Sequence, residues 1–389
     1  MHLTKEEEKM LEGECGWANQ ISMKILARLG ELYDATRLIP VQSAHLSGVS
    51  YKHLGDASID FLQALTEGSG KAKTLSTLNP SSFDPSYLTK RYPRERLQQQ
   101  SRIIDFYKRM GIQPTLTCTP YYLQTPKQGQ HLAWAESSAV IYANSVLSAW
   151  TNREGSPSAL AAALIGKTPN FGIHQTENRQ PNMLVNVETR LNNLTEYGAV
   201  GIHLGKMLKD KIPMFKGLRN PSDDDLKHLG AAMASSGMTA LFHHKPTRTK
   251  QRLETISVET KDVKEAIASI STSNETPNLV FIGCPHCSFK ELRRVSRLLE
   301  GKKVREGCEL WVCTSKYMRE REKESVATIE HAGGQVLCDT CVLVTWIKDL
   351  GVHTLMTNSA KTAFYAPTLN EVDATLAPMN KCIKTACKD

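Results

Sequence analysis

The chain has 389 residues, of which 40% are hydrophobic and 23% are charged, as in an ordinary soluble globular protein. Its net charge is +8, but lysine and arginine are spread among acidic residues, which argues against a nucleic-acid-binding surface. No apolar run approaches the roughly 18 residues of a membrane span, and the charged N-terminus, MHLTKEEEKM, lacks the apolar segment of a signal peptide. We therefore expect a cytoplasmic protein of two or three domains.

The first part of the chain alternates predicted helices with short strands. A capping box at Thr4 predicts a helix that runs towards Ala35. A strand-like segment, 37–41, precedes a hydroxyl-rich, glycine-containing loop at 42–51, followed by a helix at 56–65. Such a loop either lets the backbone approach a ligand closely or is an ordinary connection.

Further along, polar residues gather beside apolar runs. We expect a helix at 95–110 and then a β-branched strand, 113–118, that ends at Cys118. Residues 134–156 carry many side-chain donors and acceptors, which is the density that a buried polar site requires. The basic, turn-rich segment 247–252 suggests a domain boundary, so we expect an N-terminal α/β region over 1–250, divided into two subdomains, and a C-terminal doubly wound α/β domain over 251–389.

The C-terminal region alternates strands and helices most clearly. Apolar strands end at Gly283-Cys284, at Cys313 and just before Cys338, and helical patterns separate them. A strand at 254–258 is expected to open this domain, and a helix at 317–331 to lie within it. Parallel strands deliver their carboxyl ends to one edge of a sheet, where ligands bind, so these cysteines are expected to converge there.

Ten cysteines suit neither a small disulfide scaffold nor a secreted protein. Four of them are expected to be plain thiols, the last two in a mobile tail: Cys15, Cys308, Cys382 and Cys387. The C-x-x-C pairs at 284–287 and 338–341 are consistent with a structural zinc site, a redox pair, or an iron–sulfur or other catalytic metal centre. Spacing alone leaves these alternatives open.

Several motifs, in order along nearly the whole chain, resemble the aconitase X family. They are SAHLSGVSYKHLGD, STLNP, TCTPY, AWAESSAVIYANSV, TNREGSPSALAAAL, GCPH, VCTS, DTC and NSAKTAFYAP. The resemblance implies an aconitase-like, multi-domain α/β fold of mostly parallel α/β/α sheets, with a cluster at strand carboxyl ends between domains. It also implies an iron–sulfur hydro-lyase that dehydrates (R)-5-phosphomevalonate to trans-anhydromevalonate 5-phosphate for isoprenoid synthesis. The chain ends without the family's small swivelling domain, so a separate small subunit is expected to form a heterodimer with it.

The same resemblance implies the site residues. The [4Fe–4S] cluster ligands would be Cys118, Cys284 and Cys341, and a [3Fe–4S] or [2Fe–2S] cluster or a mononuclear iron are the alternatives. The implied substrate contacts are Gly48, Val49, Ser50, Asn79, Pro80, Glu136, Ser137 and Lys361. Among these, Glu136 and Lys361 are the catalytic candidates, although in the wider superfamily the base lies on the swivelling domain.

Two other functions compete with this hypothesis. One is the cis-3-hydroxy-L-proline dehydratase activity of the same family, whose substrate carries no phosphate. The other is a non-catalytic protein whose zinc or iron–sulfur site only stabilises the fold, although Glu136, Arg153 and Lys361 would have no purpose in such a site. Cys287 and Cys338 leave open which member of each C-x-x-C pair is the ligand.

Overall fold

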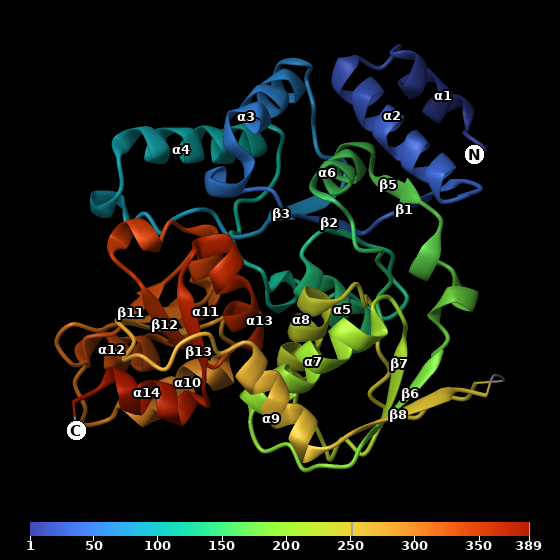
Figure 1. The fold of residues 1–389 in the computed structure, drawn as a ribbon. Coiled ribbons are helices and arrows are strands. Elements are labelled where there is room, and N and C mark those ends of the chain that lie inside the picture. The colour runs from blue at the N-terminus through green and yellow to red at the C-terminus, as the bar shows by residue number, and fades with distance from the viewer. Residues whose placement is uncertain (250–251, 389) are drawn as a thin grey trace. The chain divides into compact units, whose positions relative to one another are not determined.

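The computed structural model describes residues 1–249 and 252–388, and the chain falls into two compact units. The N-terminal unit comprises Met1–Ser82 and Leu88–Gln180, and the C-terminal unit comprises Phe83–Tyr87 and the chain from Pro181 onward. Figure 1 labels the elements along the chain. The domain boundary expected at residues 250 and 251 lies outside the described residues and stays a prediction.

The N-terminal unit is built around two small sheets (Figure 1). In the first sheet β2 pairs in parallel with both β3 and β4, and in the second β1 pairs antiparallel with β5. The strands are β1 (Leu38–Pro40), β2 (Ser43–Leu46), β3 (Leu75–Leu78), β4 (Ala133–Trp134) and β5 (Lys167–Pro169). The helices are α1 (Lys5–Glu12), α2 (Trp17–Leu32), α3 (Tyr51–Glu67), α4 (Arg94–Arg109), α5 (Ser137–Ser145) and α6 (Ser156–Ile165).

The N-terminal helical segment starts where its sequence predicts but does not continue as one helix. Thr4 Oγ1 accepts a hydrogen bond from the Glu7 N–H while the Glu7 carboxylate accepts one from the Thr4 N–H, which is the predicted capping box. Gly13 then adopts φ +96°, a left-handed conformation that closes α1. The expectation of a single helix towards Ala35 is therefore wrong, because Gly13 and Gly16 separate α1 from α2.

A three-stranded sheet begins the main part of the C-terminal unit. β6 (Met183–Val187) pairs in parallel with β7 (Pro213–Lys216) and β8 (Glu254–Val258). β8 was expected to open the C-terminal sheet, but it instead completes this smaller one. The accompanying helices are α7 (Leu194–Leu208), α8 (Asp223–Ser236) and α9 (Thr260–Ser269), and α7 packs along both others.

The larger sheet of the C-terminal unit has the strand order β11-β10-β9-β12-β13, and all four pairings are parallel. The order reverses between β9 and β12, which confirms the predicted doubly wound, mostly parallel sheet. Its strands are β9 (Leu279–Ile282), β10 (Glu309–Cys313), β11 (Gln335–Leu337), β12 (Thr354–Thr357) and β13 (Asp373–Leu376). Its helices are α10 (Phe289–Leu299), α11 (Lys316–Arg321), α12 (Lys323–His331), α13 (Ala360–Tyr365) and α14 (Met379–Ala386).

Two expectations for the C-terminal unit are wrong. The single helix predicted at 317–331 divides into α11 and α12 at Glu322, whose backbone leaves the helical region while its carboxylate pairs with Arg293. The expected mobile tail is ordered, because α14 packs against β9 and β12 and buries Cys382. Short 3-10 turns cover 89–91, 120–122, 172–174, 176–179, 342–344 and 348–350, and a π-helical turn covers 366–370.

Candidate active site

In the N-terminal unit, the predicted substrate contacts follow the strands of one parallel sheet. The loop Gly48–Ser50 follows β2, and Asn79 with Pro80 follows β3. Glu136 and Ser137 follow β4. Since the carboxyl ends of parallel strands lie at the same edge of a sheet, the fold brings these residues together in this unit.

The loop that follows β2 is fixed through its carbonyl groups. Tyr107 Oη donates to Gly48 O at 2.9 Å, and Gln100 Nε2 donates to Val49 O at 2.8 Å. Gly48 has φ +73°, and a Cβ atom there would lie 2.1 Å from Ser156 Oγ, so a larger residue does not fit. Within the described residues, the N–H groups of Gly48 and Val49 donate to no acceptor. The loop therefore offers two backbone donors just before the N-terminus of α3.

Glu136 is held in a chain of hydrogen bonds. Its Oε2 atom accepts from Asn79 Nδ2 at 2.9 Å, and its Oε1 atom accepts from Ser138 Oγ at 2.9 Å. Asn79 Oδ1 lies 3.4 Å from His45 Nε2, and His45 Nδ1 lies 2.8 Å from Thr77 Oγ1. The carboxylate of Glu136 is thus oriented by hydrogen bonds to both oxygens, and the residue as a whole is 9% exposed.

His45 is a site residue that sequence reasoning missed. It lies in β2 and is fully buried, and burial lowers the pKa of its imidazole to about 4, although the charge of Glu136 opposes this. His45 is therefore neutral at pH 7, with one ring nitrogen as donor and the other as acceptor. The only hint in the sequence was its position within the SAHLSG motif. The alternation of a β-strand predicts apolar residues on the buried face and so gave no reason to expect a histidine there.

Cys118 lies beside the end of β3, although not on the strand that the sequence suggested. Of residues 113–118, only Gln113 forms a bridge to β3, and Leu116 has φ +46°, which interrupts extended backbone. Thr117 N donates to Leu78 O at 3.0 Å and so brings Cys118 to the carboxyl edge of the same sheet. The Cys118 side chain is 7% exposed.

In the C-terminal unit, the other predicted residues lie at the carboxyl edge of the large sheet. Cys284 follows β9, Cys313 is the last residue of β10, and Cys338 and Cys341 follow β11. Lys361 follows β12 and is 9% exposed. Cys284 and Lys361 thus flank the point at which the strand order reverses, where ligands of such sheets bind.

The two C-x-x-C pairs each contain one cysteine that faces this point. The pKa of the Cys341 thiol is raised to about 12, mainly by burial and to a lesser extent by the charge of Cys284. The ammonium group of Lys361 opposes this shift. Cys341, Cys284 and Lys361 therefore share one environment. Cys287 is fully buried, and its backbone is bonded to Cys313 and Thr314 at the end of β10. The charges of Cys341, Cys287 and Cys338 all raise the pKa of Cys313 as well, after burial, so Cys284 and Cys341 as the ligands stay a prediction.

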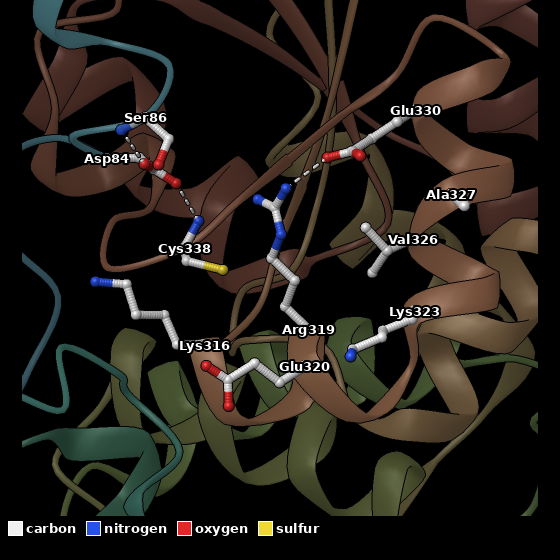
Figure 2. Close-up of a pocket in the computed structure, with 10 residues that line it drawn as sticks. All are labelled: Asp84, Ser86, Lys316, Arg319, Glu320, Lys323, Val326, Ala327, Glu330 and Cys338. Carbon is white, nitrogen blue, oxygen red and sulfur yellow. Dashed lines mark hydrogen bonds and ion pairs between the residues drawn. The ribbon is translucent and has the colours of Figure 1, made fainter.

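Cys338 has a different environment, which Figure 2 shows. Its N–H donates to Asp84 Oδ2 at 2.6 Å, and Asp84 Oδ1 accepts from Ser86 N at 2.6 Å. Burial and the charge of Asp84 raise the pKa of its thiol to about 12, while Arg319 acts in the opposite direction. The backbone of Cys338 is thus bonded to the segment 83–87, while its thiol points towards Arg319 (Figure 2).

A pocket of about 380 Å³ lies over Cys338 (Figure 2). It is lined by charged groups of both signs from α11, α12 and the segment 83–87: Asp84, Lys316, Arg319, Glu320, Lys323 and Glu330. Arg319 pairs with Glu330 at 2.8 Å, and Lys316 pairs with Asp339. Three of the six charged groups are acidic and three are basic, so the lining of the pocket has no excess of either sign, and the ion pair of Lys316 with Asp339 restrains the loop after β11.

The donor set of the C-terminal unit suits a sulfur-liganded metal. Cys284, Cys287, Cys313, Cys338 and Cys341 are buried and form no disulfide, and burial keeps the pKa of those at 313, 338 and 341 far above neutrality. A bound cation would replace the protons of its ligands and compensate the buried charge. Within residues 1–249 and 252–388, no group of three or more His, Cys, Asp or Glu is arranged as a metal site. Of the three predicted ligands, Cys284 and Cys341 share one unit, whereas Cys118 belongs to the other.

Sequence models for three consecutive domains of one family match the chain. They are described as the aconitase X first domain over residues 1–177, the second domain over 181–268 and the third domain over 277–388. The chain belongs to the aconitase X family. The family predicted from the sequence motifs is thereby confirmed.

Full-length relatives carry a consistent name. The phosphomevalonate dehydratase large subunit of Methanocaldococcus jannaschii is 42% identical, in an alignment that covers 99% of this chain and 100% of the relative. The protein of the same name from Methanothermobacter thermautotrophicus is 43% identical, with 96% of each chain covered. A protein named cis-3-hydroxy-L-proline dehydratase, from Pseudomonas aeruginosa, is 31% identical, and the alignment covers 69% of it.

A solved structure agrees with this fold. The crystal structure titled Thermococcus kodakaraensis aconitase X (holo-form) has a TM-score of 0.93 and 40% identity, with 99% of this chain and 100% of that chain covered. The predicted aconitase-like α/β fold class is therefore confirmed. No helix in the described parts of the chain is long and apolar enough to cross a membrane.

Proposed function

We propose that this chain is the large subunit of a hydro-lyase that dehydrates (R)-5-phosphomevalonate to trans-anhydromevalonate 5-phosphate. The observation that carries the proposal is the full-length similarity, at 41–43% identity, to four archaeal proteins named phosphomevalonate dehydratase large subunit. The proteins named cis-3-hydroxy-L-proline dehydratase are more distant, at 29–31% identity. That activity is the second candidate.

The proposed cofactor is an iron–sulfur cluster, with [4Fe–4S] as the first expectation. Cys118, Cys284 and Cys341 would hold it, since soft thiolates are the usual ligands of such clusters. With three protein ligands, an open iron would act as a Lewis acid that makes the substrate hydroxyl a better leaving group. Cys341 lies near Cys284 and Lys361, which supports Cys284 and Cys341 as two of the ligands.

The chain's own residues would bind the two anionic ends of the substrate. Gly48 and Val49 lie in the loop that precedes α3, so their N–H groups could donate to an anion there, and the N-terminus of a helix favours a phosphate or a carboxylate. Asn79 and Pro80 follow the neighbouring strand at the same sheet edge. Lys361 would supply a buried positive charge for the substrate carboxylate while the C2 proton leaves.

Glu136 is the proposed proton acceptor. Two hydrogen bonds, from Asn79 and Ser138, fix its carboxylate, and an oriented carboxylate can take a proton from a bound substrate without reorganising. Asn79 is in turn held by the neutral His45, so the side-chain amide keeps its donor towards Glu136. Ser137, the first residue of α5, would contact the substrate next to it. If a small subunit supplies the base, Glu136 would instead position or protonate the substrate.

A small subunit that carries the swivelling domain is the proposed partner. The relatives named above are each called a large subunit, which supports a second chain of some kind. The substrate class, a small phosphorylated hydroxy acid, follows from the same names. Isoprenoid synthesis by a mevalonate route would be the metabolic context.

The test uses this chain co-expressed with its small partner and reconstituted with iron and sulfide without oxygen. Incubation with 5-phosphomevalonate should give a product lighter by one water, detected by mass spectrometry. A protein with full iron content that leaves 5-phosphomevalonate unchanged but dehydrates cis-3-hydroxy-L-proline would establish the second candidate. A protein that acts on neither substrate and binds no iron would refute the dehydratase proposal and favour a structural role for the cysteines.

A further inference from the structure

The two cysteine loops of the C-terminal unit do not follow neighbouring strands. The first, 284–287, follows β9, the second, 338–341, follows β11, and β10 lies between these strands. Neighbouring strands are about 4.8 Å apart, so the two loops start roughly 10 Å apart. For a metal centre to take one ligand from each loop, an interaction must fix the distance between the two loops.

His286 connects the loops directly. Its Nε2 atom lies 2.9 Å from Thr340 O, and because a carbonyl group only accepts, this nitrogen donates. Thr340 immediately precedes Cys341, and His286 is two residues after Cys284. The imidazole is fully buried, so solvent offers no alternative partner for the carbonyl. A side chain of the first loop thus restrains the backbone of the second loop next to its predicted ligand.

His286 is also restrained at its own backbone. Lys227 Nζ, on α8, donates to His286 O at 3.3 Å. The same ammonium pairs with Glu291 and, at 3.3 Å, with Asp224, and its side chain is fully buried. Glu291 accepts from His228 Nε2 at 2.8 Å and caps the start of α10. The first loop is therefore tied to two helices through one buried ion-pair network.

We infer that His286 is a positioning residue that sets the spacing of Cys284 and Cys341 for metal binding, and that Lys227 anchors it. This role rests on the iron–sulfur centre proposed above. Polar groups outside the first shell of a metal site orient its ligands, and their loss typically lowers metal affinity about 10–100-fold. Asp84 accepts a hydrogen bond from Cys338 N at the start of the second loop. Loss of His286 would therefore remove the restraint at Thr340 and leave the restraint at Cys338 in place.

The experiment compares three variants of the full chain after reconstitution with ferrous iron and sulfide without oxygen. His286→Phe removes the donor but keeps a planar ring, and His286→Gln keeps an N–H group at a similar reach. His353→Gln is the matched control, because His353 is exposed in the same unit and its ring has no hydrogen-bond partner in the described chain. The measurements are iron per chain, the rate of iron release to excess chelator, the magnetic-resonance line shape of the reduced cluster, and urea unfolding of the iron-free chains.

We expect His286→Phe to release iron roughly 10–100-fold faster than the wild type, with an altered line shape. His286→Gln should recover most of this loss, and His353→Gln should match the wild type. The iron-free Phe and Gln variants should unfold at similar urea concentrations. If His286→Phe does not fold, His286→Asn, whose amide is too short to replace Nε2, takes its place.

The outcomes separate this inference from the proposed function. A loaded wild type together with a His286→Phe chain that keeps its iron at the wild-type rate would refute the role of His286 alone. The inference would also be refuted if the Phe and Gln variants lost iron equally fast and their iron-free chains were less stable to the same extent. His286 would then contribute only to the stability of the core. A wild type that takes up no iron would refute the proposed cofactor, and the role of His286 with it.

Discussion

Removal of the Lys227 ammonium group is expected to destabilise the C-terminal unit strongly. In Lys227→Met, Glu291 and Asp224 would lose their shared cation, while the side-chain volume is nearly kept. The side chains of Lys227 and Glu291 are 0% and 3% exposed, so water cannot replace the missing partner. Breaking a buried ion pair by removing one partner typically costs about 3–5 kcal/mol.

The electrostatics of Glu291 lead to a similar magnitude. Burial alone would raise the pKa of this carboxyl group, but Lys227 and His228 lower it from 4.5 to about 2. That difference corresponds to roughly 3 kcal/mol in favour of the charged form in the folded chain. Because the pKa is lower in the folded than in the unfolded state, the contribution is present above pH 4.5 and is lost as the pH falls towards 2.

Urea unfolding of the iron-free chain, followed by far-UV circular dichroism, measures the effect. We expect Lys227→Met to lower the free energy of unfolding at pH 7 by about 3–5 kcal/mol and to flatten its dependence on acid pH. The double variant Lys227→Met, Glu291→Gln should recover part of the loss, because it removes the unpaired charge. Lys211→Met is the control, since the Lys211–Glu254 pair is largely exposed and is expected to contribute less than about 1 kcal/mol. A Lys227→Met chain as stable as this control would refute the reasoning.

Three further predictions concern the site itself. Cys341→Ser should abolish iron loading of the reconstituted chain whereas Cys338→Ser should retain it, as measured by iron per chain, and the reverse result would exchange the proposed ligands. Glu136→Gln should lower kcat about 10²–10⁴-fold with little change in KM, since an amide oxygen still accepts from Asn79; an unchanged kcat would place the base elsewhere. Gly48→Ala should raise KM, because the added Cβ would lie 2.1 Å from Ser156 Oγ and the loop would have to move. The control is Gly129→Ala, which has a similar positive φ but no atom near the added Cβ and should leave KM unchanged. Equal KM values for the two variants would exclude the loop from substrate binding.

The sequence was most informative where the chain alternates strand and helix. The strands ending at Cys284 and Cys313 were predictable because four or five consecutive apolar residues stop at a small or polar residue before each helix. The predicted helix at 317–331 failed because its break depends on Glu322, whose carboxylate binds Arg293 on another helix. Residues 319–325 are all charged or polar, so apolar periodicity carries no information at Glu322 and does not reveal the break.

Contacts between distant parts of the chain were beyond prediction. Asp84 binds the N–H group of Cys338 across 254 positions, and His286 binds the carbonyl group of Thr340 across 54. Neither hydrogen bond produces a periodic pattern in the sequence, because each joins the side chain of a loop residue to a backbone group. The resemblance to a family predicted candidate reactive residues, but the residues that hold them in place could be identified only from the structure.

The environments of the two C-x-x-C pairs show why spacing alone could not choose a ligand. Within the second pair, the backbone N–H of Cys338 donates to Asp84. The pKa of the Cys341 thiol, in contrast, is shifted mainly by burial and also by the charges of Cys284 and Lys361. A thiolate at 338 would face the carboxylate of Asp84, and this repulsion adds to the cost of burial. At 341 the nearby Lys361 offsets part of the cost of burial, as Arg319 does at 338, and the pKa of both thiols is raised to about 12. The two cysteines, three residues apart, thus differ in the charged groups around them, which come from other strands and segments, and Cys341 as the ligand stays a prediction.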